Sequence, residues 1–517
     1  MRIGTALTIL PPVQVIAVFG PTGVGKTAVA IALAERLRAA GEDPVAVSAD
    51  ALQVYAGLEA LTLLRRRDTG QHFEAAVDVQ RVGGHRDRIL ALRPQPLRER
   101  HRHRRLAHAG RAEDGDERER GHRGSIFTLM PVRIGSGLST TPDARAGAVE
   151  AALAARRGLN GAPCDLALLF AAGAHVAAPE ATLEGVHEAL APAELAGCGA
   201  GGVIGGRREV EEGTGVAVWA AHLDAGRATA FHATVEELGD GTGALAGMPE
   251  LAGADGALLM ADPATFPTDP VLRFLAEAAP TVPLVGGLAS ARTLDGGTAL
   301  LCGEAVHDAG AVGVRLDGVE LLPCVSQGAT PIGPELTITA ADGNLIAELA
   351  GKPALAKLRE TIEALDPDDL QLVRGGLLVG IVVDANKPDY VQGDFLVRGL
   401  VGADPESGHV SVAADVHPGQ VVRLHARDAA SADRDLRDAL GVRMRALGGR
   451  TPAGALVFSC NGRGRGMFGT ADHDAEVVDD GLAGAPIAGF FAAGEIGPVG
   501  GHAFLHSFTA TLAVFAA

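Results

Sequence analysis

The sequence predicts an α/β fold in which layered mixed sheets are built from repeated strand-helix-strand units. Its strands are written as continuous apolar runs, such as Leu-Ala-Leu-Leu-Phe at 166–170, and strands of this kind are buried on both faces by helices. A similar order of strand, helix, glycine-rich turn and strand recurs along the chain. Aromatic residues make up only 3% of the 517 residues, so the cores must rely on Ala, Val and Leu.

The recurrence predicts three copies of one unit. The first copy has a strand at 165–170, a helix at 178–192, a turn at 197–205 and a strand at 215–219. The second has a strand at 256–260, a helix at 269–279, a turn at 285–290 and a closing strand at 298–302. The third has a strand at 454–458, a turn at 489–497 and a strand at 509–515. Generic α/β units with similar composition would give the same pattern, and the fold class is the same under either interpretation.

Composition narrows the class of protein. Apolar residues at 47% and charged residues at 21% are typical of globular chains. A net charge of −18 and the scarcity of aromatic rings disfavour nucleic acid as a partner, because phosphates are repelled and bases find no stacking surface. The five cysteines are scattered without a C-x-x-C pair, which indicates a reducing compartment. No segment has the character of a membrane span, so we expect a soluble cytoplasmic protein with no membrane partner and no metal site.

Residues 63–129 differ from the rest of the chain. All their basic residues are Arg, and runs such as Arg-Glu-Arg-His-Arg-His-Arg-Arg at 98–105 follow neither helical nor strand periodicity. A basic arm that binds nucleic acid is one interpretation. We favour a disordered bridge of the kind that GC-rich DNA yields when it is read out of frame. Met130 then opens an acidic, regularly patterned stretch and has the character of a natural start.

The N-terminal segment 1–62 contains a phosphate-binding motif. A buried strand at 13–19 leads into Gly20-Pro21-Thr22-Gly23-Val24-Gly25-Lys26-Thr27 and then into an Ala-rich helix, which is the strand-loop-helix setting of a Walker A loop. Backbone N–H groups in such a loop surround phosphate oxygens, the lysine reaches the terminal phosphates and the threonine ligates Mg²⁺. The phosphate-binding residues predicted here are Gly20, Gly23, Gly25, Lys26 and Thr27.

The motif that follows at 47–58, Val-Ser-Ala-Asp-Ala-Leu-Gln-Val-Tyr-Ala-Gly-Leu, resembles the second motif of tRNA dimethylallyltransferases. The resemblance implies that Asp50 acts as a general base in tRNA prenylation. It ends near Thr62, and later motifs of that family are not found. A fragment of two strands and a helix is too small to bury a core, so we expect a truncated P-loop α/β fragment without this activity. ATP and Mg²⁺ enter as cofactors only if the fragment folds.

The remainder, 130–517, contains four glycine-rich motifs: Gly197-Cys198-Gly199-Ala200-Gly201-Gly202 with Glu211-Glu212-Gly213, 325–333 (Val-Ser-Gln-Gly-Ala-Thr-Pro-Ile-Gly), 458–464 (Phe-Ser-Cys-Asn-Gly-Arg-Gly) and 493–498 (Ala-Gly-Glu-Ile-Gly-Pro). With these motifs the segment resembles the FIST family, which consists of an N-terminal and a C-terminal FIST domain; we assign these to 130–335 and 336–517. The resemblance implies a sensory role in prokaryotic signalling, with an amino acid or similar small metabolite as ligand and no cofactor. No kinase, cyclase or receiver region is attached, so we expect the output to lie in a partner protein.

A ligand site is predicted where the strand at 454–458 ends, because binding residues in α/β sheets collect at the carboxyl ends of strands. The candidates are Cys460, Asn461 and Arg463, with Glu495 from a neighbouring motif. Arg463 can hold a carboxylate as a bidentate fork and Glu495 can hold an ammonium group, so an amino acid satisfies both. The alternatives are an ordinary surface arginine for Arg463 and a turn or helix-cap acid for Glu495.

Three other motifs have weaker functional interpretations. Cys460 can act as a nucleophile, but no Cys-His-Asn spacing supports this and we favour a buried, inert thiol. Asp472-His473-Asp474 can bind a metal, but three consecutive residues cannot all face one ion, and we favour a solvated turn. Gly197 to Gly205 lacks the helix and the ribose-binding acid of a dinucleotide loop.

These observations leave three classes of function open. A ligand-binding sensor that shifts between two arrangements of its lobes comes first. An enzyme is the alternative, either as the nucleotide-dependent tRNA prenyltransferase fragment or through the Cys460 loop. A scaffold that binds only protein is the third.

Overall fold

The structure is a computed structural model, and it describes residues 7–10, 13–21, 44–48, 58–65, 132–238, 242–373, 376–385, 387 and 389–516. Most of the predicted bridge, the Walker A residues from Gly23 to Thr27 and Asp50 lie outside this range. The described N-terminal strands are β1 (Leu7–Leu10), β2 (Val13–Pro21), β3 (Pro44–Ser48) and β4 (Leu58–Arg65), in the order β1-β2-β4-β3 with antiparallel neighbours. The predicted strand at 13–19 is confirmed as part of β2, which also includes Gly20, and β4 crosses the expected boundary at residue 62.

The rest of the chain contains three copies of one unit, as the recurrence predicts, but each copy has four strands where the recurrence indicated two. When the four strands of a copy are numbered in chain order, they lie across the sheet in the order third, second, fourth, first. The second and third strands run parallel, and the other neighbouring strands run antiparallel. Unit 1 is β5 (Arg133–Ser139), β6 (Leu166–Ala172), β7 (Glu194–Gly199) and β10 (Gly215–His222). Unit 2 is β11 (Arg227–Leu238), β13 (Gly256–Ala261), β14 (Leu284–Leu288) and β17 (Ala311–Asp317). Unit 3 is β18 (Leu321–Gln327), β26 (Pro452–Cys460), β27 (Ile487–Ala492) and β30 (Thr509–Ala516).

Each unit also carries a hairpin between its third and fourth strands, and each hairpin extends the sheet of a different unit. The hairpin of unit 1 pairs with β27 of unit 3, that of unit 3 pairs with β14 of unit 2, and that of unit 2 pairs with β7 of unit 1. The exchange is cyclic, so the three sheets are hydrogen-bonded into a closed ring. The hairpins are β8 (Val203–Gly205) with β9 (Arg208–Val210), β15 (Leu300–Cys302) with β16 (Ala305–His307), and β28 (Glu495–Val499) with β29 (His502–His506); β12 (Thr242–Ala246) pairs with β11.

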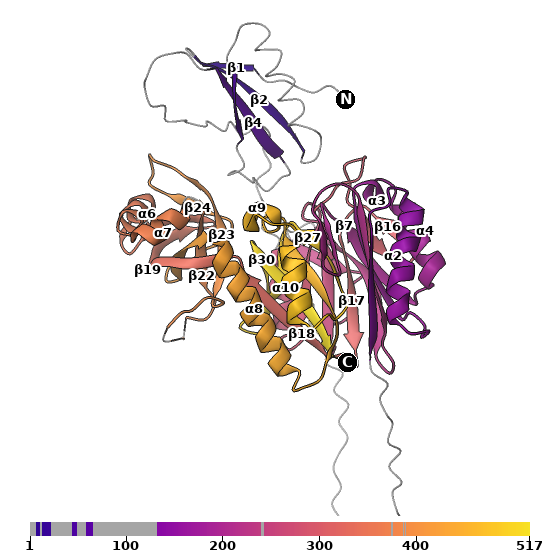
Figure 1. Cartoon of the computed structure of the whole chain (residues 1–517). Helices are drawn as coiled ribbons and strands as arrows, with labels where there is room; N and C mark the ends of the chain where they lie inside the picture. The colour runs from indigo at the N-terminus through magenta and orange to yellow at the C-terminus, as the bar shows by residue number, and fades with distance from the viewer. Residues whose placement is uncertain are drawn as a thin grey trace, which may run out of the picture.

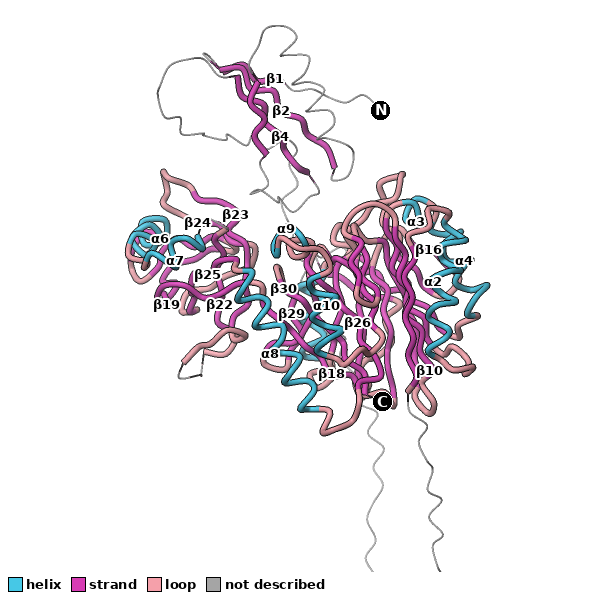
Figure 2. Tube along the Cα trace, in the orientation of Figure 1, coloured by secondary structure: helices cyan, strands magenta, loops and turns pink. Residues whose placement is uncertain are grey.

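The three sheets share one core, and helices cover their outer faces (Figures 1 and 2). Because side chains alternate along a strand, Leu168, Leu258 and Leu456 point into the shared core, whereas their neighbours pack under helices. None of the described helices is both long and apolar enough to span a bilayer. The helices of the units are α2 (Ala144–Gly158), α3 (Ala174–Ala177), α4 (Pro179–Leu190), α5 (Thr268–Ala278), α8 (Ala429–Ala446), α9 (Arg465–Phe468) and α10 (His473–Gly481).

Two details of the predicted units are wrong. The glycine-rich segments expected to be turns belong largely to strands, because their glycines lie directly against the parallel neighbour. A Cβ on Gly197, Gly286 or Gly489 would lie 1.9, 1.8 or 1.8 Å from a carbonyl oxygen of the second strand. The segment 298–302 is not the closing strand of unit 2; it contains β15 of the exchanged hairpin, and β17 closes the sheet.

A separate module, residues 329–427, is inserted between β18 and α8 and has its own core. Its strands lie in the order β19-β25-β22-β23-β24-β20-β21, and a further pairing of β19 with β20 closes the sheet on itself. The expected domain boundary at 335/336 falls inside β19. The module consists of β19 (Ala329–Asp342), β20 (Leu345–Leu349), β21 (Lys352–Pro353), α6 (Ala354–Glu363), α7 (Pro367–Val373), β22 (Leu377–Val382), β23 (Phe395–Ala403), β24 (Val410–Val412) and β25 (Val421–Arg427).

Candidate functional site

The loop after the second strand occurs in all three units, and its chemistry differs between them. The strand pairings make Ala172, Asp262 and Cys460 equivalent positions. In unit 1 this position is apolar, and in unit 2 Asp262 pairs with Arg292 at 2.7 Å. Among the three units, only unit 3 has a thiol, an amide and a guanidinium in this loop, from Cys460, Asn461 and Arg463. The three loops at this end of the ring therefore differ in chemistry.

Cys460 ends β26 and is buried. Its Sγ accepts hydrogen bonds from the backbone N–H of Gly462 at 3.4 Å and of Phe508 at 3.3 Å. Burial, reinforced by the nearby Glu495 carboxyl, raises the pKa of the thiol far above its ordinary value. A thiol that stays protonated is a weak nucleophile, and this environment gives it a packing role.

Glu495 begins β28 and is completely buried. One carboxyl oxygen, Oε2, accepts hydrogen bonds from the Thr509 backbone N–H at 3.1 Å and from Thr509 Oγ1 at 2.8 Å. The other, Oε1, is buried and has no N–H or O–H donor among the described residues. The Cys460 thiol, a weak donor, lies beside this carboxyl and forms a side-chain hydrogen bond with it. Burial raises the pKa of Glu495 to about 8, so the carboxyl is largely protonated at neutral pH.

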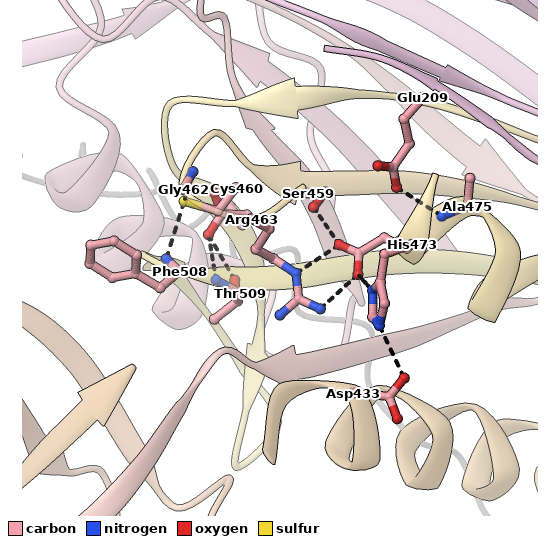
Figure 3. A network of polar contacts seen from close by, with 12 residues as sticks. Glu209, Asp433, Ser459, Cys460, Gly462, Arg463, His473, Ala475, Phe508 and Thr509 are labelled. Carbon is pink, nitrogen blue, oxygen red and sulfur yellow. Dashed lines mark hydrogen bonds and ion pairs between the residues drawn. The ribbon is translucent and has the colours of Figure 1, made fainter. Parts of the chain in front are cut away.

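Arg463 is not a surface residue: its side chain is fully buried. Its Nε and Nη2 donate to Asp474 at 2.7 and 2.9 Å, so the fork predicted for a ligand carboxylate is bound to a protein carboxylate (Figure 3). The third nitrogen of the guanidinium, Nη1, is buried and has no hydrogen-bond partner among the described residues. The guanidinium carbon also lies 5.1 Å from the ring centre of Phe468.

Asp474 is the site residue that sequence reasoning misplaced. It was expected in a solvated turn, but it lies in the first turn of α10 and is fully buried. Besides Arg463, it accepts hydrogen bonds from Ser459 Oγ at 2.7 Å and from His473 Nδ1 at 3.0 Å. Burial alone would raise the pKa of Asp474, but the Arg463 charge outweighs it and holds that pKa well below its ordinary value. Arg463 lies in the loop after β26 and Asp474 lies in α10, so no helical or strand period relates the two residues and no local signal predicts the pair.

Units 1 and 2 complete the surroundings of the unit 3 loop. Glu209, on the exchanged hairpin of unit 1, accepts a hydrogen bond from the Ala475 backbone N–H at 2.9 Å (Figure 3), and burial together with Asp474 raises its pKa to about 7. Gly201 of unit 1 donates its N–H to Ser290 Oγ of unit 2 at 2.8 Å. Asn461 is exposed at this same end of the ring, 3.9 Å from the position of a Cβ on Gly201.

The predicted ligand residues therefore divide into two groups. Cys460, Arg463 and Glu495 are buried together, and Glu495 contributes to raising the pKa of both Cys460 and Arg463. Asn461 faces outward from the same loop. Of the phosphate-binding residues, Gly20 lies in β2 and the others lie outside the described residues.

Comparison with known proteins gives two distinct similarities. The chain is 44% identical over 384 residues to the uncharacterized protein Rv0628c of Mycobacterium tuberculosis, which covers 74% of this chain and 100% of that protein. It is also 44% identical over 384 residues to the uncharacterized protein Mb0898c of Mycobacterium bovis, covering 74% of this chain and 99% of the relative. A tRNA dimethylallyltransferase of Clavibacter sepedonicus is 41% identical over 69 residues, only 13% of this chain and 22% of the relative.

Two family models match adjacent parts of the chain. The FIST N domain matches residues 165–352 and the FIST C domain matches residues 354–498. The first match begins just before β6 of unit 1 and continues through unit 2, β18 of unit 3 and the start of the inserted module. The second match covers the rest of the module and unit 3 as far as β28. Together with the relatives, these matches show that the chain belongs to the FIST family, a family of sensory and signal-transduction proteins.

Proposed function

We propose that this protein is a sensor that binds an amino acid or a similar zwitterion at the Cys460–Arg463 loop and passes the signal to a partner protein. The observation that carries the proposal is a pair of buried polar atoms that have no nitrogen or oxygen partner among the described residues, Glu495 Oε1 and Arg463 Nη1. A buried polar atom without a hydrogen-bond partner is costly, and a ligand that supplies the missing partner removes this cost.

The two atoms offer complementary chemistry to a zwitterion. A ligand ammonium beside Glu495 favours the ionised carboxylate, so binding would release the proton that burial retains. A ligand carboxylate can take the remaining N–H of Arg463, while Asn461 at the exposed edge supplies an amide. Binding alone accounts for this arrangement, and no bond in the ligand needs to change.

The loop also contacts the inserted module, which suggests how binding is transmitted. Arg427, the last residue of β25, donates from Nη2 to the Gly462 carbonyl at 2.5 Å and lies 4.7 Å from the ring centre of Phe508. A ligand that draws the loop toward itself changes this contact. The population of module orientations then shifts in favour of the one that binds the ligand better.

Thermal unfolding of the full-length chain with each of the common amino acids tests the proposal. One or a few of them should raise the melting temperature, and Glu495→Gln should remove the shift because glutamine cannot become an anion. Glu476→Gln, on the exposed side of α10, is the matched control and should retain it. If no metabolite stabilises the protein, the scaffold function replaces the sensor. A covalent mass increase at Cys460 on ligand addition would instead indicate catalysis.

Nucleotide binding by the N-terminal fragment is the second candidate, and the similarity to a tRNA dimethylallyltransferase favours it. That similarity covers too little of the relative to imply prenylation. ATP should slow hydrogen exchange only in residues 15–55, and Lys26→Ala should abolish the effect. Unchanged exchange in this segment at saturating ATP would remove the candidate.

A further inference from the structure

A groove lies along β18 of unit 3, and none of the residues that line it belongs to the candidate site. Its volume is about 460 Å³, which is within the range of small-molecule sites. The edge of β18 forms its floor, α8 forms one wall and the turn between β28 and β29 forms the other. The residues that matter for the argument are Pro323, Val325, Gln327, Asp435, Arg443 and Val499.

The floor of this groove is an open strand edge. β18 is the end strand of its sheet and pairs there with β30 alone. The backbone N–H of Gln327 donates to Asp435 at 2.7 Å, and its carbonyl accepts from the Gln392 side chain at 3.4 Å, so its peptide groups point away from β30. Peptide groups alternate along a strand, and the pairing with β30 has an unbroken register. Val325 therefore presents both its N–H and its carbonyl to the groove, and Pro323 presents a carbonyl.

The wall formed by α8 places opposite charges at the two ends of this edge. Asp435 lies beside Gln327, whereas Arg443 lies eight residues further along the helix, about 12 Å away at 1.5 Å per residue. The Nε of Arg443 is buried without a partner among the described residues. Between the charges the lining is apolar, with Val325 on the floor and Val499 on the far wall.

The geometry points to a second ligand site, in which a free tripeptide lies extended along β18. Its ammonium meets Asp435, its carboxylate meets Arg443, and its central residue exchanges two hydrogen bonds with Val325. Three extended residues span about 10 Å, which matches the separation of the two charges. The ends fix the direction as antiparallel to β18, and the main-chain pairing is the mode by which sheet edges bind extended peptides. This site shares no residue with the proposed amino acid site and takes a different class of ligand.

Calorimetric titration of the full-length chain with trialanine tests the assignment. Trialanine should bind to the unmodified chain, and its C-terminal amide should bind roughly 10- to 100-fold more weakly because a charge-assisted hydrogen bond is lost. Arg443→Gln should lower the affinity for trialanine by a similar factor, and this variant should bind trialanine and its amide with the same affinity. Arg445→Gln, exposed on the same helix, is the control and should behave as the unmodified chain. An equal penalty for amidation in all three proteins would overturn the assignment, as would no binding at all.

Further measurements show whether the peptide binds in this groove or at the amino acid site, and whether the ligand is a peptide or a single amino acid. Glu495→Gln should leave the affinity for trialanine unchanged, and a loss there would place the peptide at the Cys460 loop instead. Methylation of the central peptide nitrogen should weaken binding, because it removes the donor to the Val325 carbonyl. Alanine that binds in the groove as tightly as trialanine would contradict an extended ligand.

Discussion

At the scale of single residues, Glu495 has the most informative surroundings, because its carboxyl is buried and only one of its oxygens has an N–H or O–H donor among the described residues. In the unfolded chain it ionises near 4.5, whereas in the folded protein its pKa is about 8. Below the lower value it is protonated in both states and costs nothing. Between the two values only the unfolded state loses the proton, so the free energy of unfolding falls as pH rises.

Glu495→Gln should therefore be more stable than the unmodified protein at pH 8, and the difference should shrink toward pH 4.5. Urea unfolding at a series of pH values measures it, and the difference between the two proteins isolates this group from Glu209, whose pKa is also raised. Glu476→Gln should give a flat difference. A Glu495→Gln difference that grows as pH falls would mean that the carboxylate is stabilised by the fold.

The Arg463–Asp474 pair gives a second prediction at this scale. Removing one member leaves the other charge buried and unpaired, which costs about 3–5 kcal/mol. Arg463→Met should therefore lower the free energy of unfolding by that amount in urea titrations, whereas Arg465→Met, exposed in the next turn, should change it little. Equal effects from the two substitutions would show that the pair does not stabilise the fold.

The sequence indicated part of this site for a physical reason that can be stated. Cys460 and Asn461 follow a buried apolar run, and the ends of such strands are where binding residues collect. Asp474 could not be found in this way, since its partner is fixed by the packing of α10 against β26. The charge on Arg463 could be assigned from the sequence, but its burial could not, because a glycine-rich context suggests exposure.

At the scale of elements, the third strands show how glycine misleads a reading of local sequence. Gly197, Gly286 and Gly489 suggested turns, yet each lies in a strand. A carbonyl oxygen of the adjacent parallel strand lies so close to each glycine that a side chain has no space. The strand-helix-strand order was predictable from apolar runs. The partner of each hairpin was not, because three similar sheet edges compete and only long-range packing decides between them.

Substitution of these glycines gives a prediction for the strands. Gly286→Ala should destabilise the protein by about 1–3 kcal/mol or more, because the new methyl group collides with the Leu259 carbonyl. Gly399→Ala is the control, since a Cβ at that strand position meets no atom within 4 Å. Chemical unfolding of both variants measures the difference. Gly286→Ala with unchanged stability would mean that the two strands separate at little cost.

At the scale of the whole molecule, the three sheets depend on one another. The sequence correctly indicated three copies in layers, and the Ala, Val and Leu residues expected in the core are there. Five aromatic side chains nevertheless lie in the shared core where the sheets face each other: Phe170 lies 5.1 Å from Phe490 of another unit, and Trp219 lies 5.0 Å from Phe515. Such contacts join residues more than two hundred positions apart, so the closed ring could not be predicted from local patterns.

The cyclic exchange of hairpins predicts which parts of the chain can be removed. Ala329 and Arg427 are cross-strand partners at the base of the inserted module, so a short glycine linker from Gly328 to Asp428 can replace residues 329–427 without moving β18 or α8. This shortened protein should still unfold cooperatively in urea and retain the α/β circular dichroism of the three-unit ring.

A chain that ends at residue 335 lacks β26, β27 and β30 of unit 3 and the hairpin that completes the sheet of unit 2. It should aggregate or unfold without a transition, because the apolar faces of two sheets are left exposed. Cooperative unfolding of the chain that ends at residue 335 would show that units 1 and 2 are stable without the closed ring.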